Sequence, residues 1–174
     1  EFLDIAGLVQ GASKGEGLGN QFLGHIRSVD AIAHIVRCFE DPDVIHVAGN
    51  VDPKRDIEII NTELILADLE AVEKRLDKTA RLAKTGDKKA VAAVDACKFF
   101  KDTLENGKPI RSLELNDDMR ELLKELNLLT AKPVLYVANV GENGLHGESQ
   151  YVNVVRDIAE KEGARLVVMC GKIE

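Results

Sequence analysis

The sequence predicts an α/β fold in which a doubly wound, parallel sheet is interrupted by a long helical segment. Three observations predict it: short apolar runs alternate with amphipathic stretches, one region carries helical periodicity alone, and a glycine-rich loop follows the first apolar run. The 174 residues suffice for one domain with a modest insertion. A chain of this size buries roughly 70% of its extended surface, so it can hold a real core.

Four short and nearly continuous apolar runs have the character of buried parallel strands. Helical stretches at 20–29 and 149–162 lie among them, and Gly163 closes the second. In such sheets the crossovers are right-handed, and ligands bind beyond the carboxyl ends of the strands. The expected strands are residues 2–5, 31–37, 133–138 and 165–169. The segments that follow them form the candidate site: Asp4 and Gly7, residues 39–46, residues 139–142, and residues 170–172.

Residues 54–130 break this alternation. One stripe of apolar residues at helical spacing runs from Ile57 for about seven turns. The turn signal at 85–87 starts a second helix, which the turn at 106–109 closes, so we expect an antiparallel pair. A third short helix, marked by apolar residues between 119 and 129, returns the chain to the sheet.

Composition narrows the function classes. The net charge is −7 and the isoelectric point about 5.2, so a basic footprint covering the whole protein is absent and any RNA contact must be local. There is no apolar run of 18 residues and no basic-then-apolar leader, so we expect a cytoplasmic protein without membrane contact. Cys38, Cys97 and Cys170 are an odd number and far apart, and we expect core thiols.

The strongest local signal is Asp4-Ile5-Ala6-Gly7, a strand that ends in Asp with a Gly three residues on. In phosphoryl-transfer sites such an Asp holds Mg²⁺, often through water, and such a Gly amide approaches the γ-phosphate. Five glycines fall in the thirteen positions from Gly7, which predicts a mobile loop. The spacing is not GxGxxG, so a dinucleotide site is disfavoured. A surface loop without a ligand is the alternative.

The run from Asp4 to Leu23 resembles the switch II region of Obg-type P-loop GTPases. Residues 34–41, 51–53 and 56–64 are similar to the YchF, or Obg-like ATPase, subfamily, and the resemblance covers essentially the whole chain. It implies an Obg-type P-loop fold with a helical coiled-coil insertion. It also implies hydrolysis of ATP, and of GTP, with Mg²⁺, and association with the large ribosomal subunit.

On this resemblance, residues 1–53 and 131–174 are parts of the nucleotide-binding domain, and residues 54–130 are the coiled-coil insertion. The chain starts without an initiator Met and contains no GxxxxGK[ST] P-loop, which the family carries upstream, and no TGS domain, which follows downstream. We therefore expect a central piece of such a protein, without the main phosphate cradle.

The segment Asn139-Val140-Gly141-Glu142 stands where true GTPases carry NKxD, whose Asp accepts two hydrogen bonds from guanine. Glu142 is one methylene longer than that Asp, and Val140 replaces the Lys that packs over the base. Charge-assisted bonds are worth roughly 1.5–3 kcal/mol each, so misplacing two removes a guanine preference of about 100-fold or more. We expect Asn139 to bond purine N7 and the Val140 backbone to read the adenine edge.

Asn139 has an alternative role, in which its side-chain amide caps the turn after its strand and contacts no ligand.

A second segment is expected to border the base. Cys170-Gly171-Lys172 aligns with the SAx loop that lines the base in the family, but it departs from Ser-Ala. Only backbone contacts of Cys170 and Gly171 with the nucleotide are therefore expected.

The residue after the DxxG motif, Leu8, is unable to orient a water molecule, so another residue must do so for hydrolysis to occur. Ras-like enzymes carry there the Gln that orients the attacking water, whereas this chain carries Leu8. The segment 41–46 follows the second strand and offers the imidazole of His46, which we expect to position the water or act as general base. The alternative is a structural histidine, which is also what we expect of the other three histidines.

Two classes of function remain open. The first is an ATP-hydrolysing switch at the ribosome, and the second is a nucleotide-regulated binding module whose helical segment docks protein or RNA with negligible turnover. Five lysines near the tip of the helical segment could touch ribosomal RNA, or they could simply be solvated. They are Lys84, Lys88, Lys89, Lys98 and Lys101.

A first prediction concerns the 174-residue chain by itself. Because it lacks the P-loop amides and Lys, we expect it to bind ATP weakly or not at all and to be inactive as a hydrolase. Titration with a fluorescent ATP analogue in Mg²⁺ measures this. Tight, stoichiometric ATP binding would contradict the expectation.

Overall fold

The computed structural model describes residues 19–40, 50–142 and 149–171, which fall into two compact units. The sheet unit holds the described residues of 30–59 and 133–171, and the helical unit holds those of 19–29 and 60–132. The boundary between the units falls inside one long helix, α2 (Pro53–Ala83). No helix in the described ranges is long and apolar enough to cross a membrane.

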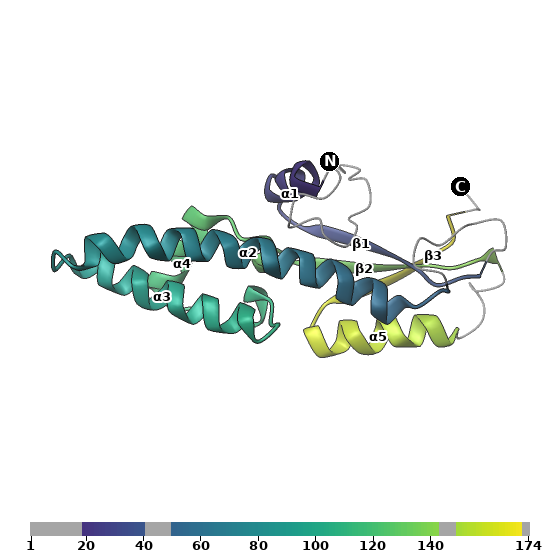
Figure 1. Ribbon diagram of the computed structural model, residues 1–174. Helices are drawn as coiled ribbons and strands as arrows, with labels where there is room; N and C mark the ends of the chain where they lie inside the picture. Colours follow the sequence, from purple (N-terminus) through teal and green to yellow (C-terminus); the bar gives the residue numbers. More distant parts are fainter. Residues whose placement is uncertain (1–18, 41–49, 143–148, 172–174) are drawn as a thin grey trace. The chain divides into compact units, whose positions relative to one another are not determined.

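The sheet unit is built on three parallel strands in the order β1-β2-β3 (Figure 1). They are β1 (Ile32–Arg37), β2 (Val134–Asn139) and β3 (Arg165–Met169). Their register aligns Ile35 with Val137 and Val137 with Val167. Three of the four expected strands are thus confirmed as a parallel sheet, and the expected strand 2–5 lies outside the described residues.

One face of the sheet carries the core of this unit. Val36, Tyr136 and Ala138 are 2%, 0% and 0% exposed and cluster with residues of α5 (Gln150–Glu162) and with Ile57 at the start of α2. The buried Tyr136 phenol donates a hydrogen bond to Glu162 Oε2 at 2.9 Å, which satisfies the polar group at the edge of the core.

Local signals in the sequence set the ends of α5. The Ser149 hydroxyl accepts a hydrogen bond from the Tyr151 N–H, as an N-cap does. Gly163 ends the helix with a φ of 66°, a left-handed conformation that glycine adopts without a Cβ penalty. The helix expected at 149–162 is confirmed.

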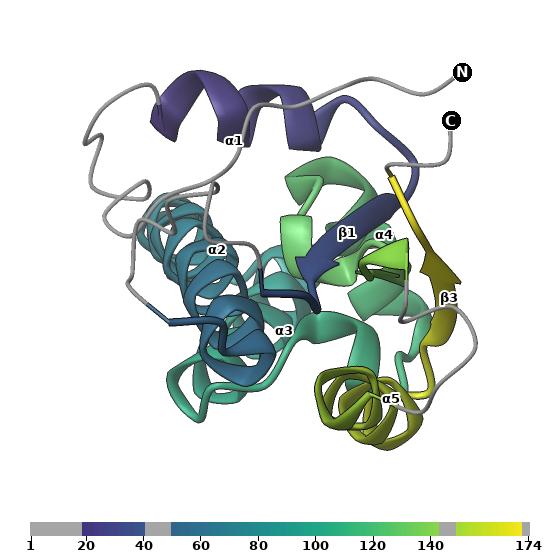
Figure 2. The ribbon, with the colours of Figure 1, turned by 90° about the vertical axis from the view of Figure 1, so that its right-hand side faces the viewer.

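The helical unit contains the rest of α2 and the antiparallel α3 (Lys88–Glu105), which lie side by side (Figure 2). Val72 of α2 is 0% exposed and packs in one cluster with Cys97 and Phe100 of α3. Lys101 Nζ lies 2.8 Å from Glu73 Oε1, which joins the two helices at the surface. The two expected helices and their antiparallel arrangement are confirmed.

A third helix, α4 (Asp117–Leu126), and two short 3₁₀ turns, η2 (Ile110–Ser112) and η3 (Leu129–Ala131), complete the core of the helical unit. Asn116 caps α4 by accepting a hydrogen bond from the Met119 N–H, and Asn127 ends it in the left-handed region at φ 49°. Apolar side chains of η2, of α4 and of the residue just before η3 join the Phe100 cluster: Ile110, Leu122 and Leu128.

The C-terminal end of α1 (Gly19–Arg27) is bound within the same unit. Asn127 Nδ2 donates to the Arg27 carbonyl at 2.8 Å, and Lys132 Nζ donates to the Val29 carbonyl at 2.7 Å. The last carbonyls of a helix lack partners within it, and a cation there complements the helix dipole. Lys132 and Asn127 thus anchor the end of α1 to the segment around η3.

All three cysteines are buried and free, which confirms the expected core thiols. Burial, together with the negative charge of Asp56, raises the pKa of Cys38 to about 11. Burial also raises the pKa of Cys97. The Cys38 and Cys97 thiols are therefore protonated at neutral pH.

A fully buried carboxylate links α2 to η3. Asp68 is 0% exposed. Its Oδ1 accepts the Leu129 N–H at 2.8 Å, and its Oδ2 accepts the Thr130 N–H and the Thr130 hydroxyl, both at 2.7 Å. Burial raises the pKa of Asp68, and the hydrogen bonds from Thr130 and Leu129 oppose that rise. Three donors compensate a carboxylate that would otherwise be costly to bury.

Replacing Asp68 with Asn keeps the shape but turns one acceptor into a donor that faces a backbone N–H of η3 in either orientation of the amide. We expect Asp68→Asn to lower the free energy of unfolding by about 2–4 kcal/mol. Urea denaturation at neutral pH measures this. The matched control is Asp77→Asn, an exposed position of α2, which should stay within about 0.5 kcal/mol of the unsubstituted chain. Equal losses in the two variants would contradict the anchoring role.

Candidate functional site

The carboxyl ends of the three strands meet at one edge of the sheet. The register places Arg37, Asn139 and Met169 side by side at the strand ends. Beyond them the Cys38 N–H donates to the Asn139 carbonyl at 2.8 Å, and the Val140 N–H donates to the Met169 carbonyl at 2.9 Å. The described parts of the segments expected to form the site therefore lie at one edge of the sheet. They are residues 39–40, 139–142 and 170–171.

The Asn139 side chain joins the ends of β2 and β3. Its Oδ1 accepts the Gly171 N–H at 3.2 Å. Within the described part of the chain, its Nδ2 has no hydrogen-bond partner. The side-chain oxygen therefore stabilises the strand ends, and the side-chain NH₂ group is a donor that can bind an acceptor such as a ring nitrogen.

Val140 and Cys170 face the core. They are 2% and 8% exposed and belong to the cluster beneath the sheet. Because the Val140 N–H is used in the hydrogen bond to Met169, only the Val140 carbonyl is left for a ligand. Both side chains are withdrawn from the edge, so these positions can offer a ligand their backbone alone.

Glu142 has an exposed side chain at the same edge. None of the other described residues forms an ion pair or hydrogen bond with its carboxylate. Gly141, just before it, lies next to Phe39, since a Cβ placed on Gly141 would be in ordinary van der Waals contact with the Phe39 Cβ, at 3.7 Å. Phe39 therefore borders the segment that carries Glu142.

Arg37 and Phe39 form a feature that sequence reasoning missed. The Arg37 guanidinium carbon lies 4.9 Å from the centre of the Phe39 ring, and Arg37 Nε donates to the Phe39 carbonyl at 3.0 Å. An aromatic residue two positions past the end of a strand, at the ligand edge of a parallel sheet, is the signal that could have identified it.

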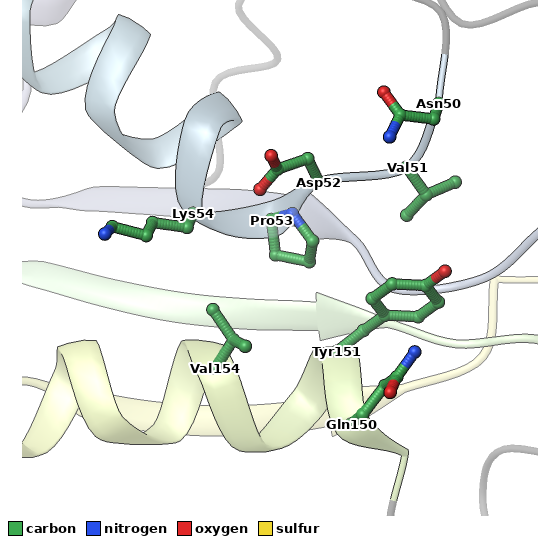
Figure 3. A pocket seen from close by; sticks show the side chains of 8 residues that line it. All are labelled: Asn50, Val51, Asp52, Pro53, Lys54, Gln150, Tyr151 and Val154. Atoms are coloured by element: carbon green, nitrogen blue, oxygen red, sulfur yellow. The ribbon is translucent and has the colours of Figure 1, made fainter.

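A hollow of about 340 Å³ lies in the sheet unit between the start of α2 and the first turns of α5 (Figure 3). Figure 3 shows Val51 and Pro53 on one side of it and Tyr151 and Val154 on the other. Its lining is mainly apolar, and the Asp52 carboxylate is used to cap α2 by accepting the Arg55 N–H at 3.1 Å. It does not include the residues expected to bind nucleotide.

Arg55 and Tyr151 fix the segments around this hollow. Arg55 donates to the Asn50 side-chain oxygen at 3.0 Å and to the Asn50 carbonyl at 2.7 Å. The Tyr151 hydroxyl donates to Glu40 Oε1 at 2.5 Å, which links α5 to the segment after β1. This hydrogen bond, with a contribution from burial, raises the pKa of Tyr151.

Asp4, Gly7 and His46 lie outside the described residues, so their expected roles stay predictions. Elsewhere in the described ranges, no group of three or more His, Cys, Asp or Glu side chains could hold a metal ion.

No protein-family model matches the chain. It is 53% identical over 176 residues to the ribosome-binding ATPase YchF of Bacillus subtilis and 49% identical over 174 residues to that of Escherichia coli O157:H7. Each match covers the whole of this chain and 48% of the relative, so the chain spans about half the length of these curated relatives.

A solved structure shows the same likeness. The YchF GTPase of Schizosaccharomyces pombe is 38% identical and has a TM-score of 0.79, and the match covers 95% of this chain and 46% of that one. These findings confirm the resemblance to the YchF subfamily of Obg-type P-loop proteins, which extends along the whole chain.

The contact between Tyr151 and Glu40 generates a titration prediction. The carboxylate stabilises the protonated phenol, so we expect Tyr151 to ionise above the ordinary pKa of 10.0, and Glu40→Gln to lower its midpoint toward that value. The chain has two tyrosines and no tryptophan, so absorbance at the phenolate band follows both directly. The control is Glu142→Gln, which removes the same charge without touching a tyrosine. Identical titrations of the two variants would contradict the contact.

Proposed function

We propose that this chain supplies the base-reading edge and the helical segment of a YchF-type nucleotide hydrolase. Such a protein binds and hydrolyses ATP, and also GTP, with Mg²⁺, and associates with the ribosome. The observation that carries the proposal is the edge formed by Asn139, Val140 and Gly171, in a chain 53% identical throughout to a relative named a ribosome-binding ATPase.

The domain organisation forms part of the proposal. β1 and β2 are neighbours in the sheet although the whole helical segment separates them in sequence. This supports an insertion, residues 54–130, between two parts of one nucleotide-binding domain, residues 1–53 and 131–174. The sheet would then be part of an Obg-type P-loop sheet.

The proposed base contacts tolerate both purines. Asn139 Nδ2 would donate to N7, an acceptor that adenine and guanine share. The Val140 carbonyl would accept from the exocyclic amino group of adenine. Glu142 is available to a ligand, but its extra methylene places the carboxylate differently from the Asp of a guanine-specific site. ATP is therefore the preferred substrate.

Hydrolysis would rest on residues named from the sequence. Asp4 would hold Mg²⁺ through water, and the Gly7 amide would bind the γ-phosphate. The ion supplies charge neutralisation at the phosphates when bound. His46 would orient the attacking water and accept its proton, a task that Leu8 is unable to perform.

The alternative is a nucleotide-regulated binding module with negligible turnover. The observation that favours it is the anchoring of α1 and η3 to the helical segment through Lys132, Asn127 and Asp68, which offers a route from a nucleotide loop to a docking arm. Nucleotide-dependent affinity for ribosomes without multiple turnovers would select this class.

A chimera provides the flanking segments for a test. Replacing the matching 176 residues of the Bacillus subtilis relative with this chain should give a protein for which ATP competes at least as well as GTP against a fluorescent nucleotide in Mg²⁺. His46→Ala in the chimera should lower kcat by about 10²–10⁴-fold with little change in nucleotide affinity.

The matched control is His25→Ala, an exposed histidine of α1, which should leave turnover unchanged. A 100-fold preference for GTP would overturn the assignment of Glu142 and of ATP as substrate. Unchanged turnover in His46→Ala would remove this residue from the mechanism.

A further inference from the structure

Two contacts in the sheet unit hold the residues on either side of one segment, residues 41–49, which carries His46. Glu40 precedes this segment in the sequence, and Asn50 follows it. Each of the two is bound by a side chain in the first turn of a helix, Glu40 from α5 and Asn50 from α2. The two helices therefore hold both ends of the stretch in which the general base is expected.

The first anchor is the Tyr151 hydroxyl, which donates a hydrogen bond to Glu40 Oε1 at 2.5 Å. The start of α5 is fixed in turn, because the Tyr151 N–H donates to the Ser149 hydroxyl and the next side chain, Val152, is buried in the core of the unit. A tyrosine side chain has only two rotatable torsions, so its hydroxyl stays close to the position that the helix gives it. The place of Glu40 is thus set by α5.

The second anchor is the Arg55 guanidinium, which donates to the Asn50 side-chain oxygen at 3.0 Å and to the Asn50 carbonyl at 2.7 Å. Arg55 is itself held at the start of α2, because its N–H donates to Asp52 Oδ1 at 3.1 Å and its Nε donates to Asp56 Oδ1 at 3.3 Å. A guanidinium presents its N–H groups in a rigid plane, so two bonds to one residue fix orientation as well as position. The orientation of Asn50 is therefore set by α2.

The two anchors meet at one place in the unit. Asn50, Val51 and Tyr151 line the same hollow (Figure 3). Tyr151 thus binds the residue before the segment 41–49 and borders the same hollow as the two residues after it. Fixing the two ends of a chain segment removes many of the conformations open to the residues between them, and His46 is one of these residues.

Stability of the fold does not account for these contacts. The hydrogen bonds of Tyr151 and Arg55 to the ends of the segment lie at the exposed surface, where polar pairs contribute little to the free energy of unfolding. The second tyrosine is different, because Tyr136 is fully buried and its bond to Glu162 satisfies a phenol in the core. Tyr151 and Arg55 instead hold the region where the chain leaves the carboxyl end of β1, the edge at which parallel sheets bind ligands.

We propose that Tyr151 and Arg55 are positioning residues for the hydrolysis of ATP, which act by holding both ends of the segment that carries His46. The inference rests on the proposed role of His46 and adds two residues that contact neither the nucleotide nor the attacking water. A general base must lie within hydrogen-bond reach of the water that it activates, and a displacement of about 1 Å can lower a rate about 100-fold. Loss of either anchor should therefore slow the chemical step and leave ATP binding unchanged.

The test uses the chimera with the Bacillus subtilis relative, which provides the flanking segments. Tyr151→Phe and Glu40→Ala each remove the first anchor, and Arg55→Lys weakens the second. Each should lower the single-turnover rate of phosphate release from ATP by about 3–30-fold, and the affinity for a fluorescent ATP analogue should stay within about twofold. The double variant Tyr151→Phe and Glu40→Ala should be no slower than either single variant, because both changes remove the same hydrogen bond.

Two controls match the chemistry of the first anchor. Tyr136→Phe removes the corresponding hydrogen bond of the second tyrosine and should leave the rate unchanged. Glu40→Gln keeps an acceptor for the Tyr151 hydroxyl and should lose less than about threefold in rate. Thermal melting followed by circular dichroism checks that every variant is folded, as the exposed position of Glu40 leads us to expect.

A second background shows whether the anchors act through His46. In the His46→Ala chimera, the further change Tyr151→Phe should have no effect on the rate, because the group that it positions is absent. An equal loss in the two backgrounds would overturn the proposal. An unchanged rate in both Tyr151→Phe and Glu40→Ala would also overturn it, as would a weaker affinity for ATP in place of a slower rate.

The outcomes separate this inference from the proposed function. If His46→Ala slows hydrolysis and the Tyr151 and Glu40 variants do not, the anchors are dispensable and the role of His46 stands. If His46→Ala leaves the rate unchanged, the proposed role of His46 fails and the positioning role of Tyr151 and Arg55 fails with it.

Discussion

The buried carboxylate of Asp68 is the constraint on which the helical unit depends. A charge with no solvent access is tolerable only when donors surround it, and the donors here are two consecutive backbone N–H groups and one hydroxyl of η3. The conformation of η3 is therefore dictated from α2, more than sixty residues earlier in the chain. Lys132, just after η3, extends the same network to the end of α1.

At the edge of the sheet, structural and chemical roles are shared within single residues. Asn139 uses its oxygen to join two strand ends, and its amino group has no partner among the described residues. Val140 uses its N–H in the sheet and keeps its carbonyl. Such division fixes the position of both free groups, since each residue is held by the same bonds that define the strand ends.

Much of the fold could be predicted from the sequence because its signals are local. Apolar runs, helical stripes and the caps at Asp87, Ser149 and Gly163 each act within a few residues. The candidate edge followed from parallel strands, whose ends must meet. Contacts between distant positions have no such local signal. In the sequence, Asp68 has the character of an ordinary surface charge. The pairs Glu73–Lys101 and Tyr151–Glu40 form only because of how the helices and the strand ends pack. The Asn139–Gly171 bond likewise depends on register.

The adjacency of β1 and β2 has a consequence for the order of folding. Their pairing closes a loop that contains the entire helical segment, and the entropy of closing a flexible loop must be lost before the pairing is rewarded. The contacts between α2 and α3, by contrast, span a short turn. Helical hairpins of low contact order form early and shorten the effective loop that remains. We therefore expect the helical segment to form before the pairing of β1 with β2, which leaves a shorter effective loop for that pairing to close.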